Sequence, residues 1–212
     1  MPGMVHVVDD DASFRTAIER RLKKAGYTVA TYTSAQQLLA HLPDDKEPGC
    51  ILLDVRIPGL SGPELQGRLN ELGSILPIVF LTGYADVQTT VRTIKAGAED
   101  FLTKPVSSEQ LLSAIERALA HHETARAQRS KLDVVRAQIA TLTPRERQVF
   151  ELVVRGKINK QIAHELGTTE RTIKAHRQQV MEKAKIQSLA ELVSIAEHLG
   201  ILAHPPKVGD SG

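Results

Sequence analysis

Two short apolar runs that end in acid, residues 5–10 (VHVVDD) and residues 51–54 (ILLD), decide the fold of this chain. Each run is aliphatic or β-branched, as strands buried in a parallel sheet are. If both strands end at the same edge of one sheet, Asp9, Asp10 and Asp54 meet outside their carboxyl ends, where open α/β sheets bind ligands. Two carboxylates about 4 Å apart repel by about 4 kcal/mol at an effective dielectric constant of roughly 20. Such a cluster therefore stays partly protonated or binds a hard cation.

The composition is that of an ordinary globular protein. The 212 residues, 42% hydrophobic and 25% charged, suffice for one large domain or two small ones. The sequence contains neither a signal-peptide pattern after Met1 nor an apolar stretch of membrane-spanning length, so we expect a cytoplasmic protein with no membrane partner. The single cysteine, Cys50, adjoins an apolar run and is interpreted as a packed thiol.

The charge is distributed unevenly along the chain. Residues 1–122 carry 12 Lys and Arg against 15 Asp and Glu, a net charge of −3. Residues 123–212 carry 15 against 10, a net charge of +5. An acidic first half and a basic second half indicate two domains, of which the second faces a polyanion.

The first 120 residues alternate between strand and helix five times. The predicted strands are residues 4–8, 28–32, 49–53, 77–81 and 99–103, and the predicted helices are residues 12–25, 34–41, 62–72 and 86–96, with a fifth after Ser107. Such alternation predicts an α/β fold, a doubly wound, five-stranded parallel sheet with helices on both faces.

The last third of the chain predicts four short helices. Thr143 and Pro144 open the first, which runs to Gly156. Asn159 is expected to cap a helix over residues 160–166, and Thr169 a longer one to Lys185. Residues 188–191 (SLAE) read as a capping box with Ser188 as the cap of a fourth helix. A tail over residues 203–212 is expected to be disordered. Two of these helices joined by a tight turn at Gly167 predict an all-α helix-turn-helix domain over residues 142–202.

A helical linker over residues 123–141 is predicted to join the two domains. Steps of three and four alternate along a stripe that is apolar except for Gln128: Ala125, Gln128, Leu132, Val135, Ile139 and Leu142. This spacing fits a weak coiled-coil seam. It fits equally well a solvated connecting helix whose apolar stripe packs on its own domains.

The strand ends of the first domain favour phosphoryl transfer. Asp54 is a candidate nucleophile, because a carboxylate can accept a phosphoryl group when a cation neutralises the transferring oxygens. Asp10 and Asp54, with the main-chain oxygen of Arg56, would supply oxygen ligands to Mg²⁺, and Asp9 would hold one of its waters. Thr82 ends another strand with a hydroxyl that can donate to a phosphoryl oxygen. Lys104 ends the last with an ammonium and precedes a proline, a good context for a cis peptide.

This constellation resembles the receiver domain of two-component response regulators over residues 4–122. The resemblance implies a flavodoxin-like fold and phosphorylation of Asp54 by the phosphohistidine of a sensor histidine kinase, with Mg²⁺ beside it. It also implies that Thr82 and Lys104 contact the phosphoryl group. Phe101 is then the aromatic residue that turns inward when the threonine moves, and the surface of the fourth helix, fifth strand and fifth helix changes, often to dimerise.

Two rival interpretations begin from the same residues. A magnesium-dependent aspartyl phosphatase would also use Asp54, but such enzymes generally need an acid two residues later, where this chain has Arg56. A substrate-capping insert is missing as well, so we do not expect an enzyme. A degenerate receiver that serves only as a dimerisation scaffold usually lacks one of the acids, the threonine or the lysine, and this sequence has them all.

The third helix of the second domain has the side chains of a recognition helix, with Arg and Lys for guanine edges and phosphates and Gln for adenine. Its Ile173, Val180 and Ala184 should pack inward. The residues that we expect at double-stranded DNA are Lys160, Arg171, Thr172, Lys174, His176, Arg177 and Gln178.

Three stretches of this half carry a second resemblance: residues 142–149 (LTPRERQV), 159–163 (NKQIA) and 172–176 (TIKAH). Together they resemble the LuxR-type four-helix domain, over residues 140–202. A receiver followed by this domain is similar to response regulators of the FixJ/NarL type. The combination implies a transcription regulator in which phosphorylation of Asp54 promotes a homodimer, whose recognition helices reach two half-sites one helical turn apart.

Overall fold

The computed structural model describes residues 3–83 and 87–201. The chain divides into two compact units after Ala127, and this division falls within helix α5, Ser108–Ala140. The tail expected to be disordered, residues 203–212, lies outside the described residues. In the part of the chain that the structure covers, no helix combines the length and the apolar character that crossing a bilayer requires.

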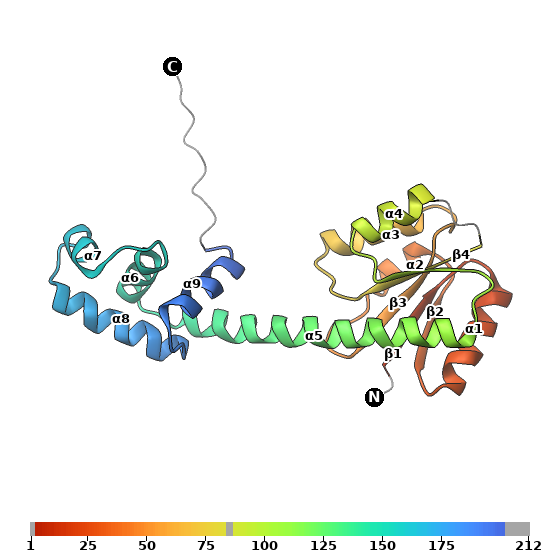
Figure 1. The fold of residues 1–212 in the computed structure, drawn as a ribbon, viewed down its shortest axis with the longest axis horizontal. Coiled ribbons are helices and arrows are strands. Elements are labelled where there is room, and N and C mark those ends of the chain that lie inside the picture. The colour runs from red at the N-terminus through yellow and green to blue at the C-terminus, as the bar shows by residue number, and fades with distance from the viewer. Residues whose placement is uncertain (1–2, 84–86, 202–212) are drawn as a thin grey trace, which may run out of the picture. The chain divides into compact units, whose positions relative to one another are not determined.

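The first unit is built on a parallel sheet (Figure 1). Its strands among the described residues are β1 (Met4–Val8), β2 (Thr28–Tyr32), β3 (Gly49–Asp54), β4 (Ile78–Thr82) and β5 (Asp100–Thr103). The strand order is β2-β1-β3-β4-β5, and every neighbouring pair is parallel. The predicted fold class is therefore confirmed, with strand ends that differ from the prediction by at most one residue.

The register of the strands brings their carboxyl ends to one edge of the sheet. Val8 of β1 lies opposite Leu53 of β3, and Thr82 of β4 lies opposite Thr103 of β5. The residue that follows β1, the last residues of β3 and β4, and the residue that follows β5 are consequently neighbours in space. This edge carries the acids, the threonine and the lysine predicted to act together.

Helices cover both faces of the sheet (Figure 1). Helices α1 (Ala12–Lys24) and α5 pack on one face with alternate strand residues, and α2 (Ala35–Ala40) and α3 (Gly62–Glu71) pack on the other. Each strand serves both layers because successive side chains point to opposite faces. In β3, for example, Leu52 belongs to the first layer and Leu53 to the second.

Helix α4 (Val87–Lys95) is attached to α3 by polar contacts. The side-chain amide of Gln66 donates to the main-chain oxygen of Thr93 at 3.1 Å. The amide of Asn70 donates to the main-chain oxygen of Ala96 at 3.2 Å. Thr93 is the buried residue of the helix, so little apolar area contributes to this contact. Hydrogen bonds to the backbone hold α4 beside α3.

The second unit is a bundle around its own apolar core. Its helices in the described region are α6 (Pro144–Val154), α7 (Asn159–Glu165), α8 (Glu170–Ala184) and α9 (Leu189–His198). Ile139 and Leu142 are buried in this core, and Val135 packs against it. For these three positions of the linker stripe, the contacts favour packing on the chain's own domain over a coiled-coil seam.

The start of α6 matches its prediction. The main-chain amide of Glu146 donates to the Thr143 hydroxyl at 3.3 Å, and the Glu146 carboxylate accepts from the Thr143 main-chain amide at 2.7 Å. Glu146 is only 6% exposed, and Lys183 of α8 lies 2.6 Å from its carboxylate. The hydrogen bond from Lys183 is the largest influence that lowers the pKa of Glu146. The cap is therefore also a link between α6 and α8.

The predicted cap of α7 is wrong. The N-cap residue is Ile158, whose main-chain amide donates to the Gln161 side chain at 3.0 Å, and Asn159 is the first residue of the helix. The Asn159 side chain instead accepts a hydrogen bond of 2.9 Å from Arg177 of α8. An asparagine that is bound to another helix is not available to cap its own.

Two glycines of α3 give a matched test of the packing below Asp54. A Cβ on Gly62 would lie 2.5 Å from the main-chain oxygen of Asp54 and 2.9 Å from the Phe80 ring, whereas a Cβ on Gly67 meets nothing within 4 Å. We expect Gly62→Ala to destabilise the first unit by about 1–3 kcal/mol through overpacking. Gly67→Ala should stabilise it by about 0.5–1 kcal/mol. Urea unfolding of the full chain measures both, and a Gly62→Ala protein as stable as wild type would contradict the contact.

Candidate functional site

The predicted acids meet at the carboxyl edge of the sheet. Asp9 directly follows β1, and Asp54 is the last residue of β3. One ligand oxygen from each of Asp9, Asp10 and Asp54 lies within 4.8 Å of the others. Asp9 and Asp54 are buried, and Asp10 is exposed. Three carboxylates this close form a set of hard oxygen donors, which is the donor type that Mg²⁺ takes in proteins.

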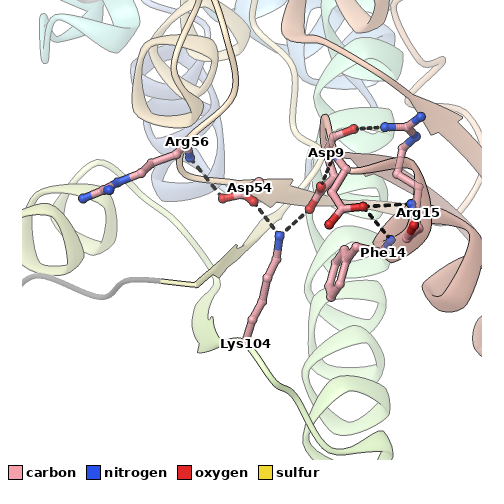
Figure 2. Close-up of polar contacts among 8 residues, drawn as sticks. Asp9, Phe14, Arg15, Asp54, Arg56 and Lys104 are labelled. Carbon is pink, nitrogen blue, oxygen red and sulfur yellow. Dashed lines mark hydrogen bonds and ion pairs between the residues drawn. The ribbon is translucent and has the colours of Figure 1, made fainter.

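Lys104 lies between two of these carboxylates (Figure 2). Its Nζ is 2.5 Å from Asp9 Oδ2 and 2.5 Å from Asp54 Oδ2. Burial raises the pKa of Asp9, against hydrogen bonds from Lys104 and Asp11 that lower it. Burial also acts to lower the pKa of Lys104, but the hydrogen bonds to Asp54 and Asp9 raise it overall. The ammonium therefore remains charged and neutralises the crowded carboxylates.

The other oxygens of Asp9 and Asp54 accept from the backbone. Asp9 Oδ1 accepts from the main-chain amide of Asp11 at 2.9 Å, and Asp54 Oδ1 accepts from that of Arg56 at 3.0 Å. The Arg56 side chain is exposed, and Figure 2 shows its guanidinium directed away from Lys104. These amides fix the orientation of both carboxylates.

The remaining predicted residues of this edge lie behind and beside the acids. Thr82 is fully buried at the end of β4, and its main-chain oxygen accepts from the amide of Lys104 at 2.7 Å. The peptide bond between Lys104 and Pro105 is cis, as its context predicted. Phe101 of β5 is half-buried, with its ring centroid 6.1 Å from that of Phe80. The structure thus brings Asp9, Asp10, Asp54 and Lys104 together, with Thr82 at the end of the neighbouring strand, whereas Phe101 packs against Phe80 in the core.

Two residues of this site were missed by the sequence analysis. Lys104 Nζ lies 4.0 Å from the centroid of the Phe14 ring, and Arg15 donates from Nη1 to the main-chain oxygen of Asp9 at 2.6 Å. Both are in the first turn of α1, directly after the acids. Phe14 is also one of only four phenylalanines in the chain. Its rarity and its position were the available signals.

The second unit presents one charged face of α8. Ile173, Val180 and Ala184 are buried, as predicted. Most of the residues expected at DNA are exposed, namely Lys160, Arg171, Thr172, Lys174 and Gln178, whereas His176 and Arg177 are half-buried.

Some of these side chains have partners within the protein. Arg177 is bound to Asn159, as described above. The Thr172 hydroxyl lies 2.9 Å from that of Thr169, which caps α8, and the Gln178 amide donates to Glu182 at 2.9 Å. Lys174 projects from the exposed face of the helix, so its charge is accessible to a ligand. Arg177 also has a role inside the helix-turn-helix, because it joins α7 to α8.

Comparison with known proteins gives each unit a family. Residues 5–116 match the response regulator receiver domain, and residues 140–196 match the luxR family of bacterial regulatory proteins. Nodulation protein W of Bradyrhizobium diazoefficiens is 40% identical over 203 residues, which cover 95% of this chain and 88% of the relative. The transcriptional regulatory protein FixJ of the same organism is 40% identical over 94% of this chain and 97% of its own length.

A solved structure matches over nearly the whole chain. The response regulator StyR superposes with a TM-score of 0.71 at 43% identity, and the match covers 93% of this chain and all of that one. The recognition of both halves from their motifs is therefore confirmed. The chain belongs to the response regulators in which a receiver domain is followed by a LuxR-type DNA-binding domain.

Proposed function

We propose that this transcription regulator is switched by phosphorylation of Asp54. In this proposal residues 1–122 form the receiver, residues 123–141 a helical linker and residues 142–202 the DNA-binding domain, and the protein acts in the cytoplasm. The observation that carries the proposal is the position of the Asp54 carboxylate. It lies 2.5 Å from the Lys104 ammonium and next to the oxygens of Asp9 and Asp10. A carboxylate that has a cation and two further acids beside it has the surroundings that phosphoryl transfer to an aspartate requires.

The proposed reaction begins at the Asp54 carboxylate. It attacks the phosphorus of a phosphohistidine on a sensor kinase, so that an O–P bond forms at Asp54 while the P–N bond to the histidine breaks. The histidine nitrogen keeps the electron pair of that bond and takes a proton from solvent, so that the histidine leaves as neutral imidazole. Lys104 then pairs with one phosphoryl oxygen and the Thr82 hydroxyl donates to another. Phe101 follows the threonine and passes the change to the surface of the unit.

Receiver domains bind Mg²⁺ at an acidic pocket, and the carboxylates of this chain fit such an ion. Asp10 and Asp54, with the main-chain oxygen of Arg56, would hold it directly, and Asp9 would orient a water ligand. When bound, Mg²⁺ supplies the positive charge that balances the phosphoryl oxygens.

Asp54→Asn should abolish phosphorylation. We expect acetyl phosphate with Mg²⁺ to label wild-type protein with one phosphoryl group, because a small phosphodonor can replace the kinase. A side-chain amide at this position is not a nucleophile of this kind, so that variant should stay unlabelled. Asp11→Asn is the matched control, because Asp11 only caps α1, accepting from Ser13 and Phe14. Intact-mass spectrometry measures the label, and a labelled Asp54→Asn protein would show that the acceptor is another residue.

We further propose that the exposed face of α8 enters the major groove of double-stranded DNA. The basic charge of this half of the chain and the exposed Arg171 and Lys174 support this orientation. Lys160, exposed at the start of α7, would contact the phosphate backbone. Thr172, His176, Arg177 and Gln178 complete the proposed set of contacts.

Lys174→Ala and Arg177→Ala should differ in their effect on stability. If Lys174 contacts a base, its removal should weaken specific binding by about 1–3 kcal/mol, or about 5- to 150-fold in Kd, with stability within about 0.5 kcal/mol of wild type. Arg177→Ala should also lower the Tm, because it removes the bond to Asn159. Fluorescence anisotropy and thermal unfolding measure the two effects. If either variant slows labelling of Asp54, the assignment of phosphorylation to the first unit and DNA binding to the second is contradicted.

Phosphorylation is proposed to promote a homodimer. The apolar side chains of α4 support a second copy as the partner: Val87, Val91 and Ile94 are 81%, 46% and 45% exposed and follow one face of the helix at steps of four and three. A dimer would also place two recognition helices on successive half-sites.

A phosphoryl mimic should therefore increase the size of the protein. We expect beryllium fluoride with Mg²⁺ to shift wild-type protein to a dimer in size-exclusion chromatography with light scattering. Val91→Asp should remain a monomer, because it places a charge in the proposed apolar interface. Gln88→Asp introduces the same charge beside this stripe, about 100° around the helix from Val87 and about 60° from Val91, and should still dimerise. A wild-type protein that stays monomeric with the mimic rules out the dimer step.

A further inference from the structure

The Phe14 ring is the third partner of the Lys104 ammonium. The nitrogen lies 4.0 Å from the ring centroid and 2.5 Å from an oxygen of each of Asp9 and Asp54. Figure 2 shows the ring and the two carboxylates around the end of the lysine side chain. A cation over the face of an aromatic ring is attracted by the negative charge of that face. The position of the ammonium thus depends on an uncharged residue as well as on the acids.

The local structure of α1 holds the Phe14 ring in this place. Asp11 caps the helix, and its carboxylate accepts from the main-chain amides of Ser13 at 2.8 Å and Phe14 at 3.1 Å. The Phe14 side chain is half-buried and packs against the core between α1 and α5. Turning the ring away would break its contacts with this core. The core contacts therefore fix the position of the Phe14 ring. The Lys104 side chain is long and has several rotatable bonds, so its position depends on the groups that contact it.

The low exposure of the Lys104 ammonium strengthens its cation–π contact with the Phe14 ring. The Lys104 side chain is only 17% exposed, so little water competes with the ring. Cation–π contacts contribute more where the cation is desolvated than at an open surface. The carboxylates of Asp9 and Asp54 hold the ammonium from one side and the Phe14 ring adds a further attraction.

The ammonium uses the oxygens that a metal ion at this site would need. Lys104 binds one oxygen of Asp9 and one of Asp54, and these two residues belong to the acidic cluster that fits a divalent cation. Two cations beside the same carboxylate oxygens repel each other. Whatever strengthens the hold on Lys104 therefore weakens the apparent affinity of the cluster for Mg²⁺.

We propose that Phe14 is a positioning residue that holds Lys104 between Asp9 and Asp54 and thereby sets the concentration of Mg²⁺ at which the receiver becomes competent. This inference rests on the proposed function, because it assumes that the metal binds at the same acids. Phe14 touches neither the metal nor the phosphoryl group. It acts through the lysine, which must give up a carboxylate oxygen when Mg²⁺ enters.

The test is a titration of the full chain with Mg²⁺ in a calorimeter. Phe14→Leu keeps an apolar side chain but removes the ring face, so it should bind Mg²⁺ about three- to tenfold more tightly than wild type. Phe14→Tyr keeps a ring face and should bind with the wild-type affinity. An unchanged affinity in Phe14→Leu, or an equal change in both variants, would overturn the proposal.

A background that lacks the lysine separates positioning from packing. In Lys104→Met the competing ammonium is gone, so adding Phe14→Leu should leave the Mg²⁺ affinity unchanged. The same several-fold effect with and without the lysine would show that Phe14 acts through core packing, and the proposal would fall. If wild-type protein and Lys104→Met both bind no Mg²⁺, the acids do not form a Mg²⁺ site, and the proposed function itself is contradicted.

The lysine can also be observed directly. In the metal-free protein the Phe14 ring current should shift the Lys104 ε-methylene protons upfield in the NMR spectrum. This shift should vanish in Phe14→Leu and persist in Phe14→Tyr. Unshifted protons in the wild-type protein would overturn the contact independently of any metal titration.

Discussion

The attraction between the Lys104 ammonium and the carboxylates of Asp9 and Asp54 is the interaction on which the site depends. Two buried carboxylates at this edge would otherwise repel each other, and burial already raises the pKa of Asp9. The lysine is separated from these acids by 95 and 50 residues in the chain. Only the parallel sheet, with β1, β3, β4 and β5 side by side, brings the three groups together. The charge pairing at the site therefore depends on the strand order of the sheet.

Most of this site was predictable because it follows the ends of strands. An apolar run that stops at Asp54, Thr82 or Lys104 identifies both the strand and the polar residue that it delivers, and parallel strands deliver such residues to the same edge. Phe14 escaped prediction for a physical reason. A phenylalanine in an amphipathic helix has the same pattern whether it packs in the core or borders a site. Its distance to Lys104 depends on where the first turn of α1 lies relative to the residue that follows β5, which no local pattern encodes.

In the DNA-binding half, too, contacts between residues close in the sequence were predictable and a contact between distant residues was not. The caps at Thr143, Thr169 and Ser188 were predicted correctly, because a cap is a bond between residues three positions apart. Asn159 was assigned to a cap as well, and there the prediction was wrong. Its side chain is bound to Arg177, 18 residues away, and a helix-capping residue and a tertiary partner look alike in a sequence. The same bond gives Arg177 a structural role that its charge alone did not suggest.

The attachment of α4 to α3 has a consequence for how such proteins diversify. Gln66 and Asn70 of α3 donate hydrogen bonds to main-chain oxygens in and just after α4, and every amino acid has the same main-chain oxygen. Mutations on the outward side of α4 can therefore accumulate without loosening the helix from the sheet. After a gene for such a protein is duplicated, the two copies can acquire different residues on the outward side of α4. Their products are then less able to pair with one another.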